Sequence, residues 1–171
     1  MKIATYNVNS VRKRLEILRP WLRRHQPDVL CLQETKVQDS EFPREAFGDL
    51  PYVLNVCGQK SYNGVAVLTR TTPDLVQFGF QDGEEPDEAT RIAYVVVKGI
   101  PIITTYVPQG YAIDSPKYAY KLAWFRRLKR YFSRMLSPDR PAIWCGDMNV
   151  APEPIDVHSP EKHLKHVCFH A

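Results

Sequence analysis

In this chain of 171 residues, Glu34 is an acidic residue at a position where its carboxylate could take part in chemistry. It lies just beyond the apolar run of residues 29–32, so a strand there would deliver its carboxylate to the edge of a sheet. A hard divalent cation such as Mg²⁺ takes oxygen ligands and often needs only one or two protein carboxylates. Glu34 is therefore a candidate metal ligand. The alternative is a surface or capping acid at a strand end.

Asp147 and Asn149 lie two residues apart after another apolar run. If the chain stays extended there, both side chains point to the same face. A carboxylate can take a proton from water while a neighbouring amide holds that water or a phosphate oxygen. Gly146 would let the backbone approach a ligand closely. An Asx-type turn explains the same residues equally well.

Two further strand ends carry polar residues. Tyr106 and Gln109 follow one apolar run, and a phenol and an amide there could donate to a phosphate oxygen. A Pro-Gly turn with a packing tyrosine is the alternative. Asn7 and Asn9 follow the first apolar run and could bind or position a ligand, although a plain turn accounts for them too.

The elements that would position these residues alternate between short apolar runs and helical patterns, which predicts an α/β fold. We expect strands at residues 3–7, 28–33, 65–69, 75–80, 91–98, 102–106 and 142–145. The link at residues 99–101 is short, which favours an antiparallel pair.

Three helices are expected. Ser10 caps the first, which Pro20 should kink or end early. The longest covers residues 117–136, with an apolar stripe that Trp124, Leu128, Tyr131 and Met135 widen. The stripe itself consists of Leu122, Phe125, Phe132 and Leu136. Residues 161–169 have a helical pattern that is still running where the sequence stops, which suggests a fragment.

Composition adds weaker constraints. The net charge of +4 is mild, but residues 126–134 form a basic segment with interleaved aromatics that could meet a phosphate backbone. The solvated face of an amphipathic helix is the alternative. No apolar run approaches membrane-spanning length, and the N-terminus lacks the zones of a signal peptide. We therefore expect one cytoplasmic domain over residues 1–171, acting as a monomer without a membrane.

Taken together, the motifs resemble the exonuclease III / AP endonuclease family of the endonuclease/exonuclease/phosphatase superfamily. The resemblance rests on their order and spacing over essentially the whole chain. Gln33-Glu34-Thr35-Lys36 is the most diagnostic element. The matching segments are residues 6–10, 32–36, 63–68, 106–110 and 146–152.

The resemblance implies a four-layered α/β sandwich, with two packed β-sheets flanked by helices. It also implies a phosphodiesterase that uses Mg²⁺, with Mn²⁺ as a substitute, on duplex DNA at abasic sites and 3′ ends. Its pattern assigns the metal to Glu34 with Asn7 close by, and the catalytic roles to Asp147, Asn149 and Tyr106. Candidates for contacts with DNA are Lys36, Asn9, Gln109 and Arg91.

This chain departs from the family pattern in one respect. The family continues into a C-terminal segment with another acid and a closing Ser-Asp-His element, and that segment is absent here. We therefore expect the fold to be incomplete at its C-terminus and the 171 residues alone to have little or no activity. Two alternatives stay open: a superfamily relative acting on a phospholipid or inositol phosphate, and a non-catalytic DNA-binding remnant.

Overall fold

The computed structural model describes residues 1–169 and divides the chain into two compact units. The first unit consists of residues 1–106 and 138–147, and the second of residues 107–137 and 148 onward. The expectation of a single domain over residues 1–171 stays a prediction. Within residues 1–169, no helix is long and apolar enough to cross a membrane.

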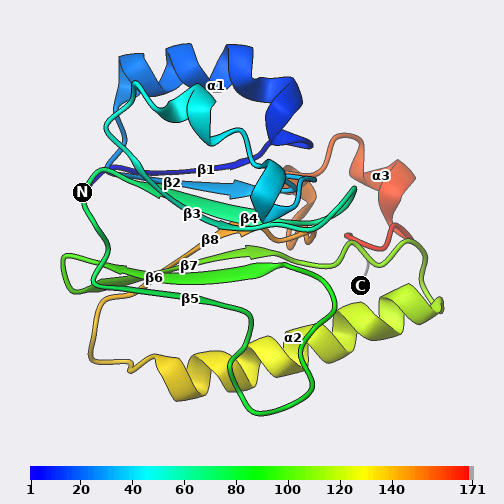
Figure 1. The fold of residues 1–171 in the computed structure, drawn as a ribbon. Coiled ribbons are helices and arrows are strands. Elements are labelled where there is room, and N and C mark those ends of the chain that lie inside the picture. The colour runs from blue at the N-terminus through cyan, green and yellow to red at the C-terminus, as the bar shows by residue number, and fades with distance from the viewer. Residues whose placement is uncertain (170–171) are drawn as a thin grey trace. The chain divides into compact units, whose positions relative to one another are not determined.

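The first unit contains two four-stranded sheets, drawn in Figure 1. The first sheet has the order β1-β2-β4-β3, with β1 and β2 parallel and the other pairs antiparallel. The second has the order β5-β6-β7-β8, in which only β7 and β8 are parallel. The first sheet consists of β1 (Ile3–Asn7), β2 (Val29–Gln33), β3 (Val53–Cys57) and β4 (Val65–Thr69). The second consists of β5 (Leu75–Phe78), β6 (Ile92–Val97), β7 (Ile100–Tyr106) and β8 (Ile143–Asp147).

The alternation of side chains along β2 separates two cores. Val29 and Cys31 belong to a buried cluster shared with the second sheet, which contributes Val95 and Ile102. On the opposite face, Leu30 and Leu32 pack with α1 (Val11–His25) and with the loops after β2. Successive side chains of a strand point to opposite faces, so β2 is buried along its whole length between the second sheet and α1.

Helix α1 begins where predicted but does not end at Pro20. It runs on to His25, although proline removes one backbone hydrogen bond. Leu18 and Leu22 are both fully buried in the core beneath the helix. Packing on both sides of Pro20 therefore outweighs the lost bond. Ser10 occupies the capping position without a side-chain cap hydrogen bond.

Three strand predictions need correction. The turn between β6 and β7 is formed by Lys98 and Gly99, both at positive φ, so β7 starts earlier than expected. Strand β3 was not predicted, because Asn55 interrupts its apolar pattern; its amide donates to the Val67 carbonyl at 3.1 Å. The apolar residues 142–145 predict a buried strand, but β8 lies at a sheet edge and is only partly buried, with Trp144 42% exposed.

The second unit contains α2 (Pro116–Met135) and α3 (Pro160–His163). The buried side of α2 consists of Lys121, Trp124, Leu128 and Tyr131, so the predicted stripe is displaced around the helix. Leu122, from the predicted stripe, is 38% exposed. The sequence pattern could not select this side because apolar residues occupy most of the helix surface and the buried side includes a lysine.

The predicted helix over residues 161–169 is wrong beyond His163. The carbonyl of Val167 accepts a hydrogen bond from Lys121 at 3.2 Å, and the carbonyl of Cys168 accepts one from the Ala151 backbone at 2.8 Å. These contacts join the residues after His163 to other segments of the second unit. The prediction of an α/β protein with two packed β-sheets and helices is otherwise confirmed.

Candidate active site

The carboxyl ends of four strands meet at one edge of the first unit. Asn7 pairs with Gln33 at the ends of β1 and β2, and Tyr106 pairs with Asp147 at the ends of β7 and β8. Both pairs of strands are parallel, so each pair delivers its last residues together. The structure therefore brings together Asn7, Glu34, Tyr106 and Asp147 at this edge.

Asn7 links the two carboxylates of this edge. Its Nδ2 donates to Glu34 Oε1 at 2.7 Å and to Asp147 Oδ2 at 2.8 Å. Its Oδ1 accepts the backbone N–H of Asn9 at 3.0 Å. All three groups of the amide are thereby used. Asn7 therefore fixes the distance between the Glu34 and Asp147 carboxylates. The position of these residues at strand ends does not by itself predict this link.

Lys36 and Asn9 lie beside Glu34. Lys36 Nζ forms an ion pair with Glu34 Oε2 at 2.9 Å and donates to Asn9 Oδ1 at 2.5 Å. The Glu34 side chain is only 17% exposed, so this pair is shielded from much of the solvent. Lys36 is therefore a part of the carboxylate cluster itself.

The backbone around these residues is held in an uncommon conformation. Asn9, Glu34 and Lys36 all have positive φ angles, between 42° and 54°. Backbone hydrogen bonds from Ser10 to the Glu34 carbonyl at 2.8 Å and from Lys36 to the Asn63 carbonyl at 3.0 Å hold the loop. Strained backbone of this kind persists only where surrounding contacts fix it, and it concentrates at functional sites.

Tyr106 is fixed by Arg91. The guanidinium carbon of Arg91 lies 4.7 Å from the centre of the Tyr106 ring, and its Nη1 donates to the Tyr106 carbonyl at 3.2 Å. A cation over the face of an aromatic ring is attracted by its electrons. Arg91 thus orients Tyr106, and a direct contact of Arg91 with DNA stays a prediction.

The surroundings tune two ionisable groups in opposite senses. Burial raises the pKa of Glu34, but hydrogen bonds from Asn7 and Lys36 and the charge of Lys36 outweigh it, so the pKa is lowered overall. Burial and the nearby Glu34 carboxylate raise the pKa of Tyr106 to about 12. At neutral pH the site therefore presents an ionised carboxylate beside a neutral phenol that can donate a proton in a hydrogen bond.

Gly146 has a structural task next to Asp147. Its φ is +132°, and a Cβ there would lie 2.1 Å from the carbonyl oxygen of Thr105. This close approach is between β8 and β7, and an approach of the backbone to a ligand stays a prediction. Glycine is required here so that β8 can pair with β7 up to its last residue.

Gln33 was not predicted as part of the site, yet it supports the edge from within. It is 1% exposed, and its Nε2 donates to Thr5 Oγ1 at 3.0 Å and to Thr104 Oγ1 at 2.9 Å. Thr5 belongs to the first sheet and Thr104 to the second, so the amide connects the sheets one residue before Glu34. The sequence signal for this role is a glutamine at the end of an apolar run. A polar side chain buried with such a strand needs hydrogen-bond partners, which neighbouring strands can supply.

Asn149 and Gln109 belong to the second unit, so their place in the site stays a prediction. Asn149 has a φ of 47°, so the chain is not extended after Asp147 as the spacing argument required. Its Nδ2 donates to the Val107 carbonyl at 2.8 Å. Gln109 Oε1 accepts the backbone N–H of Tyr111 at 2.6 Å.

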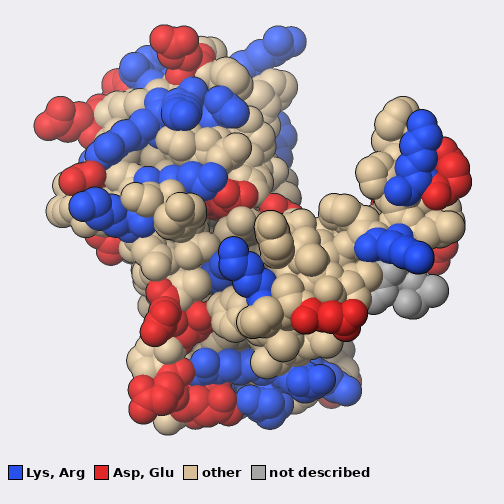
Figure 2. All heavy atoms as spheres, turned by 90° about the vertical axis from the view of Figure 1, so that its right-hand side faces the viewer, with Lys and Arg blue, Asp and Glu red and all other residues tan. Residues whose placement is uncertain are grey.

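Basic side chains occur on both long helices. In the first unit they gather over α1, in the upper part of Figure 2, where ion pairs join Arg12 to Glu41 and both Arg19 and Arg23 to Asp49. In the second unit, Arg126 and Arg130 on α2 are exposed. The contact of this basic segment with a phosphate backbone stays a prediction.

Residues 4–167 match the Endonuclease/Exonuclease/phosphatase family, and the chain belongs to this family. It is 32% identical over 170 residues to exodeoxyribonuclease III of Haemophilus influenzae, a match that covers 96% of this chain and 63% of that protein. The chain thus spans somewhat less than two thirds of the length of this relative.

Two solved structures are also similar. An AP endonuclease from Archaeoglobus fulgidus is 52% identical, with a TM-score of 0.94, over 99% of this chain and 65% of that one. A 3′ phosphatase from Neisseria bound to a product DNA hairpin is 36% identical, with a TM-score of 0.92, over 99% of this chain and 66% of that one. The resemblance to exonuclease III and the AP endonucleases is thereby confirmed.

Proposed function

We propose that this protein is a metal-dependent DNA-repair nuclease that hydrolyses phosphodiester bonds in duplex DNA at abasic sites and at 3′ ends. The observation that carries the proposal is the cluster in which Asn7 joins the Glu34 and Asp147 carboxylates beside Tyr106. The proposal is supported by relatives named as an exodeoxyribonuclease III, an AP endonuclease and a DNA-bound 3′ phosphatase.

The donor set fits a hard divalent cation, because carboxylate oxygens from two strand ends converge within reach of one amide. Glu34 would hold Mg²⁺, or Mn²⁺ in its place, with Asn7 beside it. When bound, the cation polarises a phosphoryl oxygen and neutralises charge that grows in the transition state.

The remaining chemistry is assigned to the side chains themselves. Asp147 accepts a proton from the attacking water, and Asn7 holds its carboxylate in place. Tyr106 stays neutral and donates a hydrogen bond to an oxygen of the scissile phosphate. Asn149 helps to place the water and the phosphate.

Contacts with the DNA backbone are proposed for Lys36, Asn9, Gln109 and Arg91. Lys36, which completes the Gln33-Glu34-Thr35-Lys36 element, and the basic segment of residues 126–134 favour DNA over a phospholipid or inositol phosphate substrate. We propose that the protein acts as a monomer in the cytoplasm.

The test is cleavage of a duplex oligonucleotide that carries one abasic-site analogue, with Mg²⁺ or with EDTA. The protein as its gene encodes it is compared with the 171-residue chain, because the relatives extend beyond the matched region. We expect Mg²⁺-dependent cutting by the protein as encoded. Absence of cutting with both Mg²⁺ and Mn²⁺ would reject DNA repair and redirect the search to phospholipids and inositol phosphates.

Replacing Tyr106 with phenylalanine should lower kcat by roughly 10- to 100-fold, because it removes one hydrogen bond to the reacting phosphate and keeps the ring under Arg91. Spectrophotometric titration supplies an independent measurement. The pKa of about 12 predicts that Tyr106→Phe removes a tyrosine that ionises well above pH 10. An unchanged kcat would exclude Tyr106 from the reaction.

A further inference from the structure

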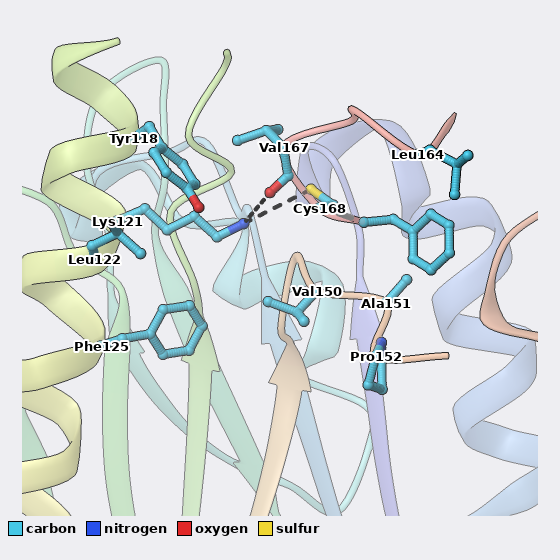
Figure 3. Close-up of a pocket in the computed structure, with 11 residues that line it drawn as sticks. Tyr118, Lys121, Leu122, Phe125, Val150, Ala151, Pro152, Leu164, Val167 and Cys168 are labelled. Atoms are coloured by element: carbon cyan, nitrogen blue, oxygen red, sulfur yellow. Dashed lines mark hydrogen bonds between the residues drawn. The ribbon is translucent and has the colours of Figure 1, made fainter. Parts of the chain in front are cut away.

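Lys121 is a buried lysine whose ammonium group binds backbone carbonyls. It is 3% exposed, and its Nζ donates to the carbonyl oxygens of Asn149 at 2.7 Å, Val167 at 3.2 Å and Gln109 at 3.3 Å. An ammonium group has three N–H donors, so it matches three converging acceptors. Figure 3 shows the side chain reaching from α2 toward Val167 and Cys168.

A lysine at this position needs a reason beyond packing. Burying an ammonium group costs several kcal/mol, and an apolar side chain of similar size is often at least as stabilising. What the lysine adds is a link between segments that are distant in sequence. Its printed partners lie 12, 28 and 46 residues away.

Gly110 leaves room for the Lys121 side chain because it has no side chain of its own. Its φ is +94°, and a Cβ there would lie 3.1 Å from Lys121 Cδ and 2.8 Å from Val167 Cγ2. The loop after Gln109 therefore passes directly over the stem of Lys121. The structure leaves room for a lysine and no room for a side chain at residue 110.

The link acts on the orientation of Asn149. The residue is held in the left-handed region at a φ of 47°, which costs free energy unless contacts fix it. Its side-chain amide donates to the Val107 carbonyl at 2.8 Å, and its own carbonyl accepts from Lys121 at 2.7 Å. Lys121 thus fixes the peptide that follows Asn149, while its bond to Gln109 fixes the neighbouring loop.

We propose that Lys121 is a positioning residue for the reaction: its ammonium group holds the loops of Asn149 and Gln109 in the conformation in which these residues act. The inference rests on the proposed function, because Asn149 and Gln109 are assigned there to the site. Lys121 itself touches neither DNA nor water in this scheme.

The first measurement does not depend on activity. Hydrogen exchange of the Asn149 side-chain amide is followed by NMR in the wild type and in Lys121→Met, with the signal assigned from Asn149→Ala. We expect exchange to accelerate by about tenfold or more in Lys121→Met, because the local hydrogen bonds open more often. Backbone amides of β4, buried in the first unit, should exchange at unchanged rates. Equal acceleration everywhere, or none at Asn149, would overturn the proposal.

The second measurement is a double-mutant cycle on cleavage of the abasic-site duplex. Lys121→Met should lower kcat by roughly 10- to 100-fold with KM changed less than about twofold, as expected for misplaced groups. In the Asn149→Ala background the same change should lower kcat clearly less than in the wild type, because the part of its effect that acts through Asn149 is already lost and only the contact with Gln109 remains. Independent, additive losses would show that Lys121 does not act through Asn149 and would overturn the proposal.

Two variants complete the design. Lys117→Met removes an exposed lysine one turn earlier on α2 and should leave both measurements unchanged. Lys121→Gln keeps two N–H donors without the charge and carries the test if Lys121→Met does not fold; it should give the same effects to a lesser degree. Faster exchange at Asn149 with no cleavage by the wild type would support the positioning role and overturn the proposed nuclease.

Discussion

Replacing Asp147 with asparagine is expected to lower the rate of phosphodiester cleavage by roughly 10²- to 10⁴-fold, the usual contribution of a positioned general base. An amide of the same size cannot accept the proton of the attacking water. It also turns one acceptor of the Asn7 bridge into a donor if the amide nitrogen faces Asn7. Single-turnover kinetics at saturating Mg²⁺ measure this loss without interference from product release.

The matched control is Asp139→Asn, which makes the same chemical change at an exposed position of the first unit. Its rate should equal that of the wild type. Thermal unfolding of both variants shows whether the fold persists. A well-folded Asp147→Asn protein that retains full activity would exclude Asp147 as the base.

Replacing Gly146 with alanine is expected to destabilise the first unit by about 3 kcal/mol or more. The added Cβ would lie 2.1 Å from the carbonyl oxygen and 2.8 Å from the nitrogen of Thr105, both backbone atoms of the paired strand. Neither atom can move without opening the β7–β8 ladder. Urea unfolding monitored by circular dichroism gives the change in the free energy of unfolding.

Gly99→Ala separates the cost of the steric contact from the cost of a positive φ at a residue with a side chain. Gly99 also has a positive φ, +74°, but an added Cβ there meets no atom within 4 Å. Its cost should be only about 1 kcal/mol, from the backbone conformation alone. Equal losses in the two variants would show that the contact with Thr105 is relieved by a small shift and does not decide the stability of β8.

The strands and the carboxylates at their ends could be predicted because local pattern determines them. The apolar run before Glu34 predicts β2, and the same logic predicts the strand that ends at Tyr106. Parallel pairing then gathers Asn7, Glu34, Tyr106 and Asp147 at one edge. The family resemblance supplied the roles of these residues, and those roles stay predictions.

The features that were missed depend on contacts between distant segments. The hydrogen bonds of Asn7 to two carboxylates, and of Gln33 to two threonines, require the pairing register and the packing of the sheets. The helix expected over residues 161–169 ends at His163, and the residues beyond it make contacts with other segments, such as the hydrogen bond from Lys121 to the Val167 carbonyl. Lys121 itself continues the spacing of Trp124, Leu128 and Tyr131, but a lysine is seldom buried, so the spacing alone does not select it.

The hydrogen bond between Asn7 and Asp147 spans 140 positions of the chain. Ribosomes add roughly 5–20 residues per second, so the interval between the synthesis of these two residues lasts several seconds or longer. During that time a growing chain already carries Asn7 and Glu34 but no strand β8. The order of synthesis therefore supplies the second carboxylate last, so under the proposed function a partly made protein beside messenger RNA lacks the residue that would accept the proton of the attacking water.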